Sequence, residues 1–187
     1  MSKQNGAITV FLDRDGVINR RRPDHVKSWE EFEFLPRSLE ALARLHRMQA
    51  RVIVITNQAV VGRGLIANEE LIRIHSRMSE EVANSGGRIE RIYACPHTPE
   101  TGCACRKPGT GLLTRASAEL GIALHHSFMV GDSESDVLAG RAVGSQPVLI
   151  RDDGLDGAQP GLPVVRDLTE AVQVIAEAMT KADVRPC

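Results

Sequence analysis

Short apolar runs alternate along the chain with longer segments in which apolar residues recur at helical spacing. The short runs predict buried strands at 7–12, 51–55, 89–94, 127–130 and 147–150. The longer segments predict helices at 36–48, between Asn68 and Gly86, at 110–120 and at 168–179. A further short helix is predicted to follow the fourth strand and to end at about 143. Strands that alternate with helices are typical of a parallel sheet with helices on both faces. The sequence therefore predicts an α/β fold with a doubly wound, Rossmann-like parallel sheet.

Polar residues and glycines mark several of the predicted helix ends. Asn68 is a candidate N-cap, and Gly121 follows the last apolar residue of its helix. Asp167 and Glu170 have the spacing of a capping box at the start of the final helix. The stretch 152–163 is rich in Gly and Pro and is predicted to be a surface loop.

The composition excludes several classes of protein. The chain has 187 residues, of which 42% are hydrophobic and 25% charged, and its net charge is −1. This length favours a single domain over 1–187 with a sizeable core. The near-neutral charge argues against a nucleic-acid partner. No apolar run approaches the roughly 20 residues that span a bilayer, and a signal peptide is not evident. We therefore expect a cytoplasmic monomer with no membrane partner.

Three of the four cysteines lie close together in the sequence, with a histidine among them. The four residues Cys95, His97, Cys103 and Cys105 can fill a tetrahedral Zn²⁺ shell with no open position, which indicates a structural ion. A reducing compartment favours a metal site over disulfides. Because the segment leads to Lys107, zinc would order the loop that carries this lysine. The alternatives are unligated cysteines in a loop and a zinc-finger module for DNA, for which the spacing is short.

Polar or charged residues follow the predicted strands. The first strand leads to Asp13 and Asp15, the second to Thr56, the third to Lys107 beyond the cysteine segment, and the fourth to Asp132. Ligands of open α/β sheets bind beyond the carboxyl ends of the strands. Each of these residues is ordinary when taken alone. Together they are the set that phosphoryl transfer through an aspartyl-phosphate requires.

Each residue type suits one part of this chemistry. Asp13 and Asp132 would repel each other unless a divalent cation lay between them, and oxygen ligands suit Mg²⁺. Thr56 and Lys107 can hold the phosphoryl oxygens in the transition state. Asp15 can protonate the leaving alkoxide and then deprotonate the attacking water. We therefore assign Asp13, Asp15, Thr56 and Lys107 as candidate catalytic residues.

The motifs resemble those of the haloacid dehalogenase superfamily of phosphotransferases, in the pattern Asp13-x-Asp15-Gly16-Val17, Thr56, Lys107 and Gly131-Asp132-x₃-Asp136. The resemblance implies that Asp13 is the nucleophile and Asp15 the general acid and base. It also implies an Mg²⁺ ion on the Asp13 side chain, the Asp15 main-chain carbonyl and Asp132. Asp136 is implied to be a supporting acid.

A cysteine and histidine loop before the motif lysine narrows the resemblance. The stretches Phe-Leu-Asp-Arg-Asp-Gly, Ile-Thr-Asn-Gln, Cys-Pro-His and Cys-Arg-Lys-Pro are similar to the enzymes that remove the 7-phosphate of D-glycero-D-manno-heptose 1,7-bisphosphate, on the route to lipopolysaccharide. The implied partner is a small phosphorylated sugar. Histidinol-phosphate phosphatases share the loop and the motifs and are the alternative. A phospho-receiver module is a further alternative, against which Asp15 speaks because its chemistry serves hydrolysis.

Members of the superfamily commonly carry a cap domain, but no segment here is long enough to form one. Substrate recognition is therefore expected from the loops 19–26 and 95–107. The candidate substrate-binding residues are Arg14, Arg21, Arg22, Asp24, Asn57, Gln58, Arg106 and Ser133.

The loop 19–26 departs from the resembled enzymes, which often read Gly-Tyr-Val where this chain has Asp24-His25-Val26. Arg20, Arg21 and Arg22 are three cations beside the predicted phosphate site, and a bisphosphorylated substrate would give them a second anion to bind. Histidines other than His97 are expected to be surface or capping residues.

Overall fold

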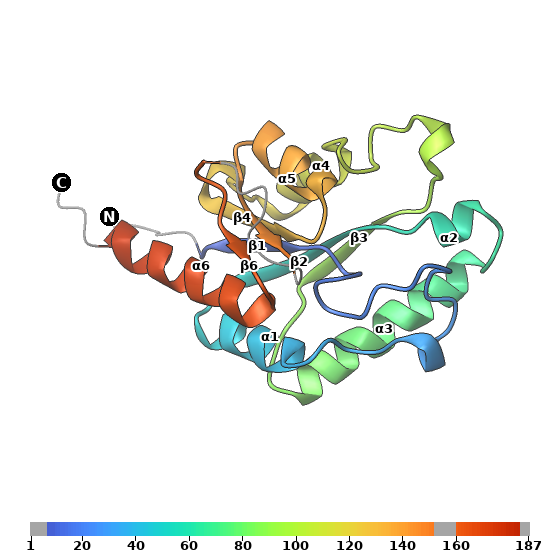
Figure 1. The fold of residues 1–187 in the computed structure, drawn as a ribbon, viewed down its shortest axis with the longest axis horizontal. Coiled ribbons are helices and arrows are strands. Elements are labelled where there is room, and N and C mark those ends of the chain that lie inside the picture. Colours follow the sequence, from blue (N-terminus) through green and yellow to red (C-terminus); the bar gives the residue numbers. More distant parts are fainter. Residues whose placement is uncertain (1–6, 152–159, 184–187) are drawn as a thin grey trace.

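The computed structural model describes residues 7–151 and 160–183, and its centre is a six-stranded parallel sheet (Figure 1). The strands lie in the order β3-β2-β1-β4-β5-β6. Their bounds are β1 Thr9–Leu12, β2 Arg51–Asn57, β3 Arg91–Cys95, β4 Ser127–Gly131, β5 Gln146–Ile150 and β6 Val164–Val165. The chain adds strands on one side of β1 and then crosses to add the others on its opposite side. The predicted doubly wound α/β fold is confirmed.

Helices cover both faces of the sheet (Figure 1). One face carries α1 (Ser38–Arg47), α3 (Asn68–Asn84) and α6 (Leu168–Asp183), and the other carries α4 (Gly111–Leu120) and α5 (Glu134–Ala142). Successive side chains of β1 point to opposite faces. Val10 and Leu12 therefore pack in the core beneath α1, α3 and α6, and Phe11 packs in the core beneath α4 and α5. Because both faces are buried, the strand sequence is continuously apolar instead of alternating.

Several short elements are absent from the sequence prediction. They are α2 (Ala59–Gly62), the two-residue strand β6, and the 3-10 helices η1 (Trp29–Glu31), η2 (Pro99–Thr101) and η3 (Leu124–His126). Each is too short to show the periodic repeat on which the prediction depends. Of the predicted surface loop, residues 152–159 lie outside the described residues.

The predicted helix ends are partly confirmed. Gly121 ends α4 in the left-handed conformation, with φ of 63°. The Asp167 carboxylate accepts a hydrogen bond from the Glu170 amide at 2.9 Å, as a cap should. The prediction for Asn68 is wrong, because Asn68 is the first residue of α3 and Ala67 holds the extended N-cap position.

The central strands bring the motif residues to one edge of the sheet. Leu12 of β1 is in register with Val130 of β4, and the Asp13 amide donates to the Val130 carbonyl at 2.9 Å. The residues that follow β1 and β4 therefore leave the sheet side by side. This is also the point at which strand addition changes direction, where open α/β sheets bind their ligands.

Between β1 and α1 the described chain forms a loop and η1, and no cap domain is inserted there or elsewhere in residues 7–151 and 160–183. None of the described helices is long and apolar enough to cross a membrane.

The two isoleucines of α3 provide a test of its buried face. Ile74 has no exposed surface, whereas Ile72 is 57% exposed. Ile74→Ala leaves a cavity and is expected to lower the free energy of unfolding by about 2–5 kcal/mol. Ile72→Ala removes little buried surface and should change it by less than about 0.5 kcal/mol. Urea denaturation of both variants measures the difference, and equal losses would contradict this packing.

Candidate active site

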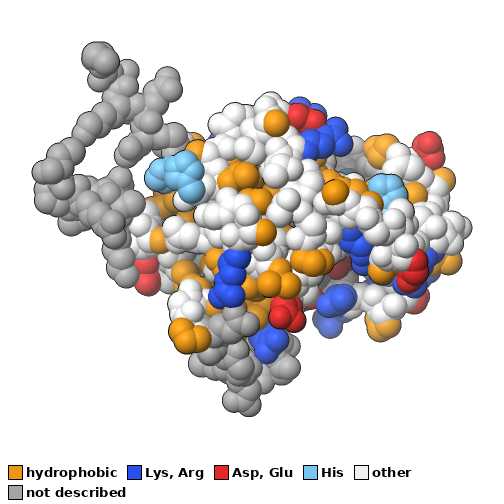
Figure 2. Space-filling view, turned by 90° about the horizontal axis from the view of Figure 1, so that it is seen from above, with side chains coloured by type: hydrophobic (Ala, Val, Ile, Leu, Met, Phe, Trp, Pro, Cys, Tyr) orange, Lys and Arg blue, Asp and Glu red, His pale blue; other side chains and the backbone are white. Residues whose placement is uncertain are grey.

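The carboxyl edge of the sheet opens into a cavity of about 320 Å³. Figure 2 shows basic side chains around a hollow at the right-hand end of the molecule, the end at which α2 lies in Figure 1. The acidic and basic residues that line the cavity are Asp13, Asp15, Arg21, Arg22, Arg106, Lys107 and Asp132, and His25 lies among them. Acids at the floor and cations at the rim suit a phosphorylated ligand that also needs a metal ion.

Lys107 lies between two acids at the floor of this cavity. Its ammonium is 2.9 Å from Asp13 Oδ1 and 2.5 Å from Asp136 Oδ1, and it donates to the Ile55 carbonyl at 2.7 Å. Burial lowers the pKa of Lys107, but the two carboxylates outweigh burial and raise it above its ordinary value. The side chain is therefore a fixed cation at neutral pH.

Asn57 holds the backbone on which Lys107 stands. The Lys107 amide donates to Asn57 Oδ1 at 3.0 Å, and Asn57 Nδ2 donates to the Lys107 carbonyl at 3.1 Å. We predicted Asn57 as a substrate-binding residue, and it does line the cavity. Because both polar ends of its amide bind Lys107, the structure supports a positioning residue instead.

Three carboxylates have oxygens that lie within 4.8 Å of one another, those of Asp13, Asp132 and Asp136. Burial raises the pKa of Asp13 to about 7, although Lys107 acts in the opposite direction. Burial also raises the pKa of Asp132, against the effect of Arg21, whose NH1 is 3.2 Å from Asp132 Oδ2. Crowded and partly desolvated carboxylates are a donor set that fits a hard divalent cation such as Mg²⁺.

Two glycines leave room for these carboxylates. A Cβ atom on Gly16 would lie 2.1 Å from Asp132 Oδ2, and one on Gly131 would lie 2.2 Å from the carboxyl carbon of Asp136. Gly16 also has a φ of 85°, which favours glycine. Neither position can take a side chain without displacing an acid.

Asp15 accepts hydrogen bonds on both carboxylate oxygens. Arg14 NH2 donates to Oδ1 and Oδ2 at 2.8 and 3.0 Å, Asn19 Nδ2 to Oδ1 at 2.9 Å, and Gln58 Nε2 to Oδ2 at 2.7 Å. Burial by itself raises the pKa of Asp15, but the Arg14 charge and these hydrogen bonds bring it below the ordinary value. Asp15 is therefore a carboxylate at neutral pH when the cavity holds no substrate.

The structure revises three of the predicted substrate-binding residues. Arg14 has no exposed surface and does not line the cavity, and its NH2 group binds the Asp15 carboxylate. Gln58 is 2% exposed and joins Asp15 to Thr56, whose Oγ1 lies 2.9 Å from Gln58 Nε2. Asp24 lies outside the cavity, where its carboxylate is bound by Lys27 and Arg22. In a strand, the alternation of side chains indicates which face each residue occupies. Because these three residues lie in loops, the sequence could not show that they point away from the cavity.

Of the residues predicted to bind substrate, Arg21, Arg22, Arg106 and Ser133 line the cavity. Arg20, the third cation of its run, does not, and its Nε donates to Glu33 at 3.0 Å. Ser133 has a second role, because it caps α5 in a box with Asp136 that the sequence analysis missed. The S/T-x-x-acid spacing is the signal that could have found this box. The sequence analysis also missed Asn19 as a hydrogen-bond partner of Asp15. The separation of four residues is the only signal in the sequence for this contact.

The four predicted zinc ligands come together at the end of β3. Sulfur–sulfur distances among Cys95, Cys103 and Cys105 are 3.2–3.6 Å, and His97 Nδ1 lies 3.2 Å from Cys105 Sγ. A tetrahedral Zn²⁺ shell with metal–sulfur bonds of about 2.3 Å has edges of about 3.8 Å, so a small expansion would admit the ion. The donor chemistry and the geometry both fit zinc.

Known proteins are similar to this chain in sequence. A HAD-hydrolase-like family model matches residues 104–171. The D-glycero-β-D-manno-heptose-1,7-bisphosphate 7-phosphatase of Pseudomonas aeruginosa is 43% identical over 142 residues, which is 76% of this chain and 80% of the relative. The enzyme of the same name from Bordetella bronchiseptica is 37% identical over 91% of this chain and 96% of its own. The chain belongs to this family of haloacid dehalogenase-like phosphatases.

Solved structures of enzymes with the same activity in their names are similar to this fold. The B. bronchiseptica D,D-heptose 1,7-bisphosphate phosphatase, a complex with magnesium and phosphate, has a TM-score of 0.84 and 35% identity over 91% of this chain and 99% of that chain. The Burkholderia thailandensis enzyme has a TM-score of 0.68 and 32% identity over 90% and 98%. The protein is thus a haloacid dehalogenase-like phosphatase, an enzyme class that uses Mg²⁺.

Zinc at the cysteine cluster is open to a direct test. Metal analysis of the purified wild-type protein is expected to find one zinc ion per chain, and Cys103→Ser should lose most of it because a thiolate ligand is gone. Cys187→Ser is the control and should retain zinc, since Cys95, His97, Cys103 and Cys105 already supply the four ligands of a tetrahedral shell. Wild-type protein without zinc, or full zinc in Cys103→Ser, would contradict the site.

The raised pKa of Asp13 predicts how stability depends on pH. Because this pKa is about 7 in the folded protein against an ordinary 3.8, folding disfavours the carboxylate, and stability is lost as pH rises from about 4 to 7. Asp13→Asn removes the titration. Without added Mg²⁺ it is expected to be more stable than wild type at pH 8 by on the order of 1–4 kcal/mol, and the gain should vanish below about pH 4.

Urea denaturation across this pH range measures the effect. Added Mg²⁺ should stabilise wild type at pH 8 and have little effect on Asp13→Asn, because binding to the folded state alone raises stability. A difference between the two proteins that is independent of pH would refute the buried titration.

Proposed function

We propose that the protein hydrolyses the 7-phosphate of D-glycero-β-D-manno-heptose 1,7-bisphosphate through a phosphoaspartyl intermediate on Asp13. The observation that carries the proposal is the position of Asp13 beside Lys107, at the floor of a cavity with a basic rim. The substrate follows from the names of relatives that align with most of this chain. Their names also favour the β anomer.

The first half of the reaction transfers the phosphoryl group to Asp13. A carboxylate oxygen of Asp13 forms a bond to phosphorus as the bond from phosphorus to the sugar oxygen breaks. Lys107 would stabilise the equatorial oxygens of the transition state. The Thr56 hydroxyl has no exposed surface and does not line the cavity, so it would add a hydrogen bond to these oxygens once it turned toward them. When Mg²⁺ is bound by Asp13, Asp132 and the Asp15 carbonyl, it offsets the charge of the phosphoryl group.

Asp15 moves the protons of both half-reactions. It gives its proton to the leaving sugar oxygen, and it then takes a proton from the water that attacks phosphorus and releases inorganic phosphate and Asp13. The low pKa of Asp15 in the structure suits the second role. For the first role it must be raised, and the negative charge of an incoming phosphate acts in that direction.

The rim supplies cations for a second phosphate. Arg21, Arg22 and Arg106 line the cavity, and Arg106 NH1 also donates to the His97 carbonyl at 3.3 Å. A bisphosphorylated sugar would place one phosphate at Asp13 and the other within reach of these guanidinium groups. We propose that zinc holds the segment from Cys95 to Lys107 in this position, as a structural ion.

Phosphate release from a panel of substrates tests the function. Both anomers of the heptose bisphosphate should be compared with histidinol phosphate, and the product should retain its 1-phosphate. We expect the β-bisphosphate to have the highest kcat/KM, and Asp13→Asn to abolish turnover while its circular dichroism spectrum is unchanged. Faster hydrolysis of histidinol phosphate would overturn the substrate assignment, and substantial activity of Asp13→Asn would overturn the nucleophile.

A further inference from the structure

Arg14 is buried between the active site and α3. Its side chain has no exposed surface, and the NH2 group binds both oxygens of Asp15. On its other side, NH1 lies 3.2 Å from Nε2 of His75. Nε of Arg14 has no hydrogen-bond partner among the described residues. The two terminal nitrogens therefore carry the polar contacts that hold this guanidinium group, one toward Asp15 and one toward His75.

His75 can serve this contact only as a neutral acceptor. A guanidinium group donates and never accepts, so Nε2 of His75 must carry the lone pair and Nδ1 the proton. His75 is 9% exposed on α3, and burial together with the Arg14 charge lowers its pKa to about 3. The expectation that this histidine lies at the surface or caps a helix is therefore wrong. His75 instead contacts Arg14, which in turn binds Asp15 of the cavity.

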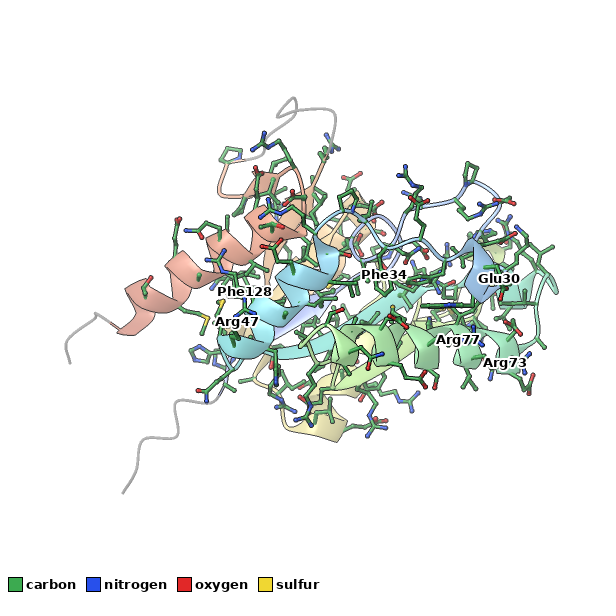
Figure 3. The ribbon with its side chains drawn as sticks, turned by 90° about the horizontal axis from the view of Figure 1, so that it is seen from below. Glu30, Phe34, Arg47, Arg73, Arg77 and Phe128 are labelled. Carbon is green, nitrogen blue, oxygen red and sulfur yellow. The ribbon has the colours of Figure 1, made fainter. Side chains whose placement is uncertain are left out.

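An aromatic cluster lies against the Arg14 guanidinium group. The guanidinium carbon lies 5.9 Å from the centre of the Phe32 ring, which stacks on Trp29 and meets Phe34 edge to face. Figure 3 shows Glu30 of η1 beside α3, on the side of Arg77. The segment of η1 also packs against α3, the helix that carries His75, and Arg14 has no exposed surface.

We propose that His75 is a positioning residue for the general acid and base Asp15, acting through Arg14. The inference rests on the proposed function, because it takes the role of Asp15 from there. His75 accepts one N–H of the guanidinium group and so fixes its rotation, and that rotation decides where NH2 meets Asp15. Without the acceptor, a buried N–H would be left unpaired, and Arg14 would turn toward another partner.

The effect should appear only in steps that need a proton from Asp15. Loss of a sugar alkoxide needs such a proton, whereas nitrophenolate leaves as a stable anion without one. The constant kcat/KM reports the steps up to loss of the leaving group. The ratio of kcat/KM for an alkyl phosphate to that for p-nitrophenyl phosphate therefore isolates the acid role of Asp15. A general loss of structure would lower both values together.

The experiment measures this ratio, with the heptose bisphosphate as the alkyl ester, for wild type, His75→Phe, His75→Gln and His75→Asn. A positioned general acid contributes about 10²–10⁴-fold, and imperfect placement forfeits part of it, so we expect the ratio to fall about tenfold or more in His75→Phe. The Gln amide oxygen can reach the position of Nε2 and should restore the ratio. Asn is too short to reach and should not restore it, which keeps the test valid if the Phe variant fails to fold.

Two controls complete the design. Ser79→Ala removes a hydroxyl that donates to the His75 carbonyl at 3.0 Å, one turn along α3, and should leave the ratio unchanged. Asp15→Asn should lower the ratio by more than any His75 variant. If Asp15→Asn lowers the ratio and the folded His75 variants do not, the inference about His75 is overturned. If Asp15→Asn itself leaves the ratio unchanged, the role of Asp15 in the proposed function fails instead.

Discussion

The buried ion triad of Lys107 with Asp13 and Asp136 is the constraint on which the site depends. A lysine this deeply buried is costly unless its charge is paired and hydrogen-bonded. The fold meets that requirement from separate elements, with one acid after β1, the other at the start of α5 and a carbonyl from β2. The glycine at the end of β4 is needed for the same reason, since any side chain there would collide with Asp136.

A second buried pair lies behind the first. Arg14 and Asp15 are joined on both carboxylate oxygens, and Gln58 and Asn19 add hydrogen bonds to the same acid. The two pairs have opposite effects, because Asp13 is left with a raised pKa and Asp15 with a lowered one. For the roles proposed above these proton affinities must change, because a nucleophile has to be ionised. A divalent cation held by Asp13 would lower the pKa of that carboxyl, and the charge of an incoming phosphate would raise the pKa of Asp15.

The candidate catalytic residues Asp13, Asp15, Thr56 and Lys107 could be predicted because their positions in the chain follow from the fold class. A parallel sheet brings the carboxyl ends of its strands to one edge, so that residues after successive apolar runs can be expected to meet. The roles of the loop residues were less predictable. Arg14 and Asn57 are charged or polar neighbours of motif residues, and nothing in their spacing distinguishes a side chain that faces the cavity from one that turns inward. Their partners, such as His75, are distant in sequence.

The sequence by itself determined the α/β class, the strands and their polar ends, the cysteine and histidine cluster and the missing cap domain. These follow from hydrophobic periodicity and from local spacing, which act over a few residues. Only the tertiary structure decided which polar groups face the substrate and which hold their neighbours. The difference depends on burial, because a charged group that is excluded from water must be paired with another group in the folded protein. Such pairs join residues that are distant in sequence, so no periodic pattern in the chain predicts them.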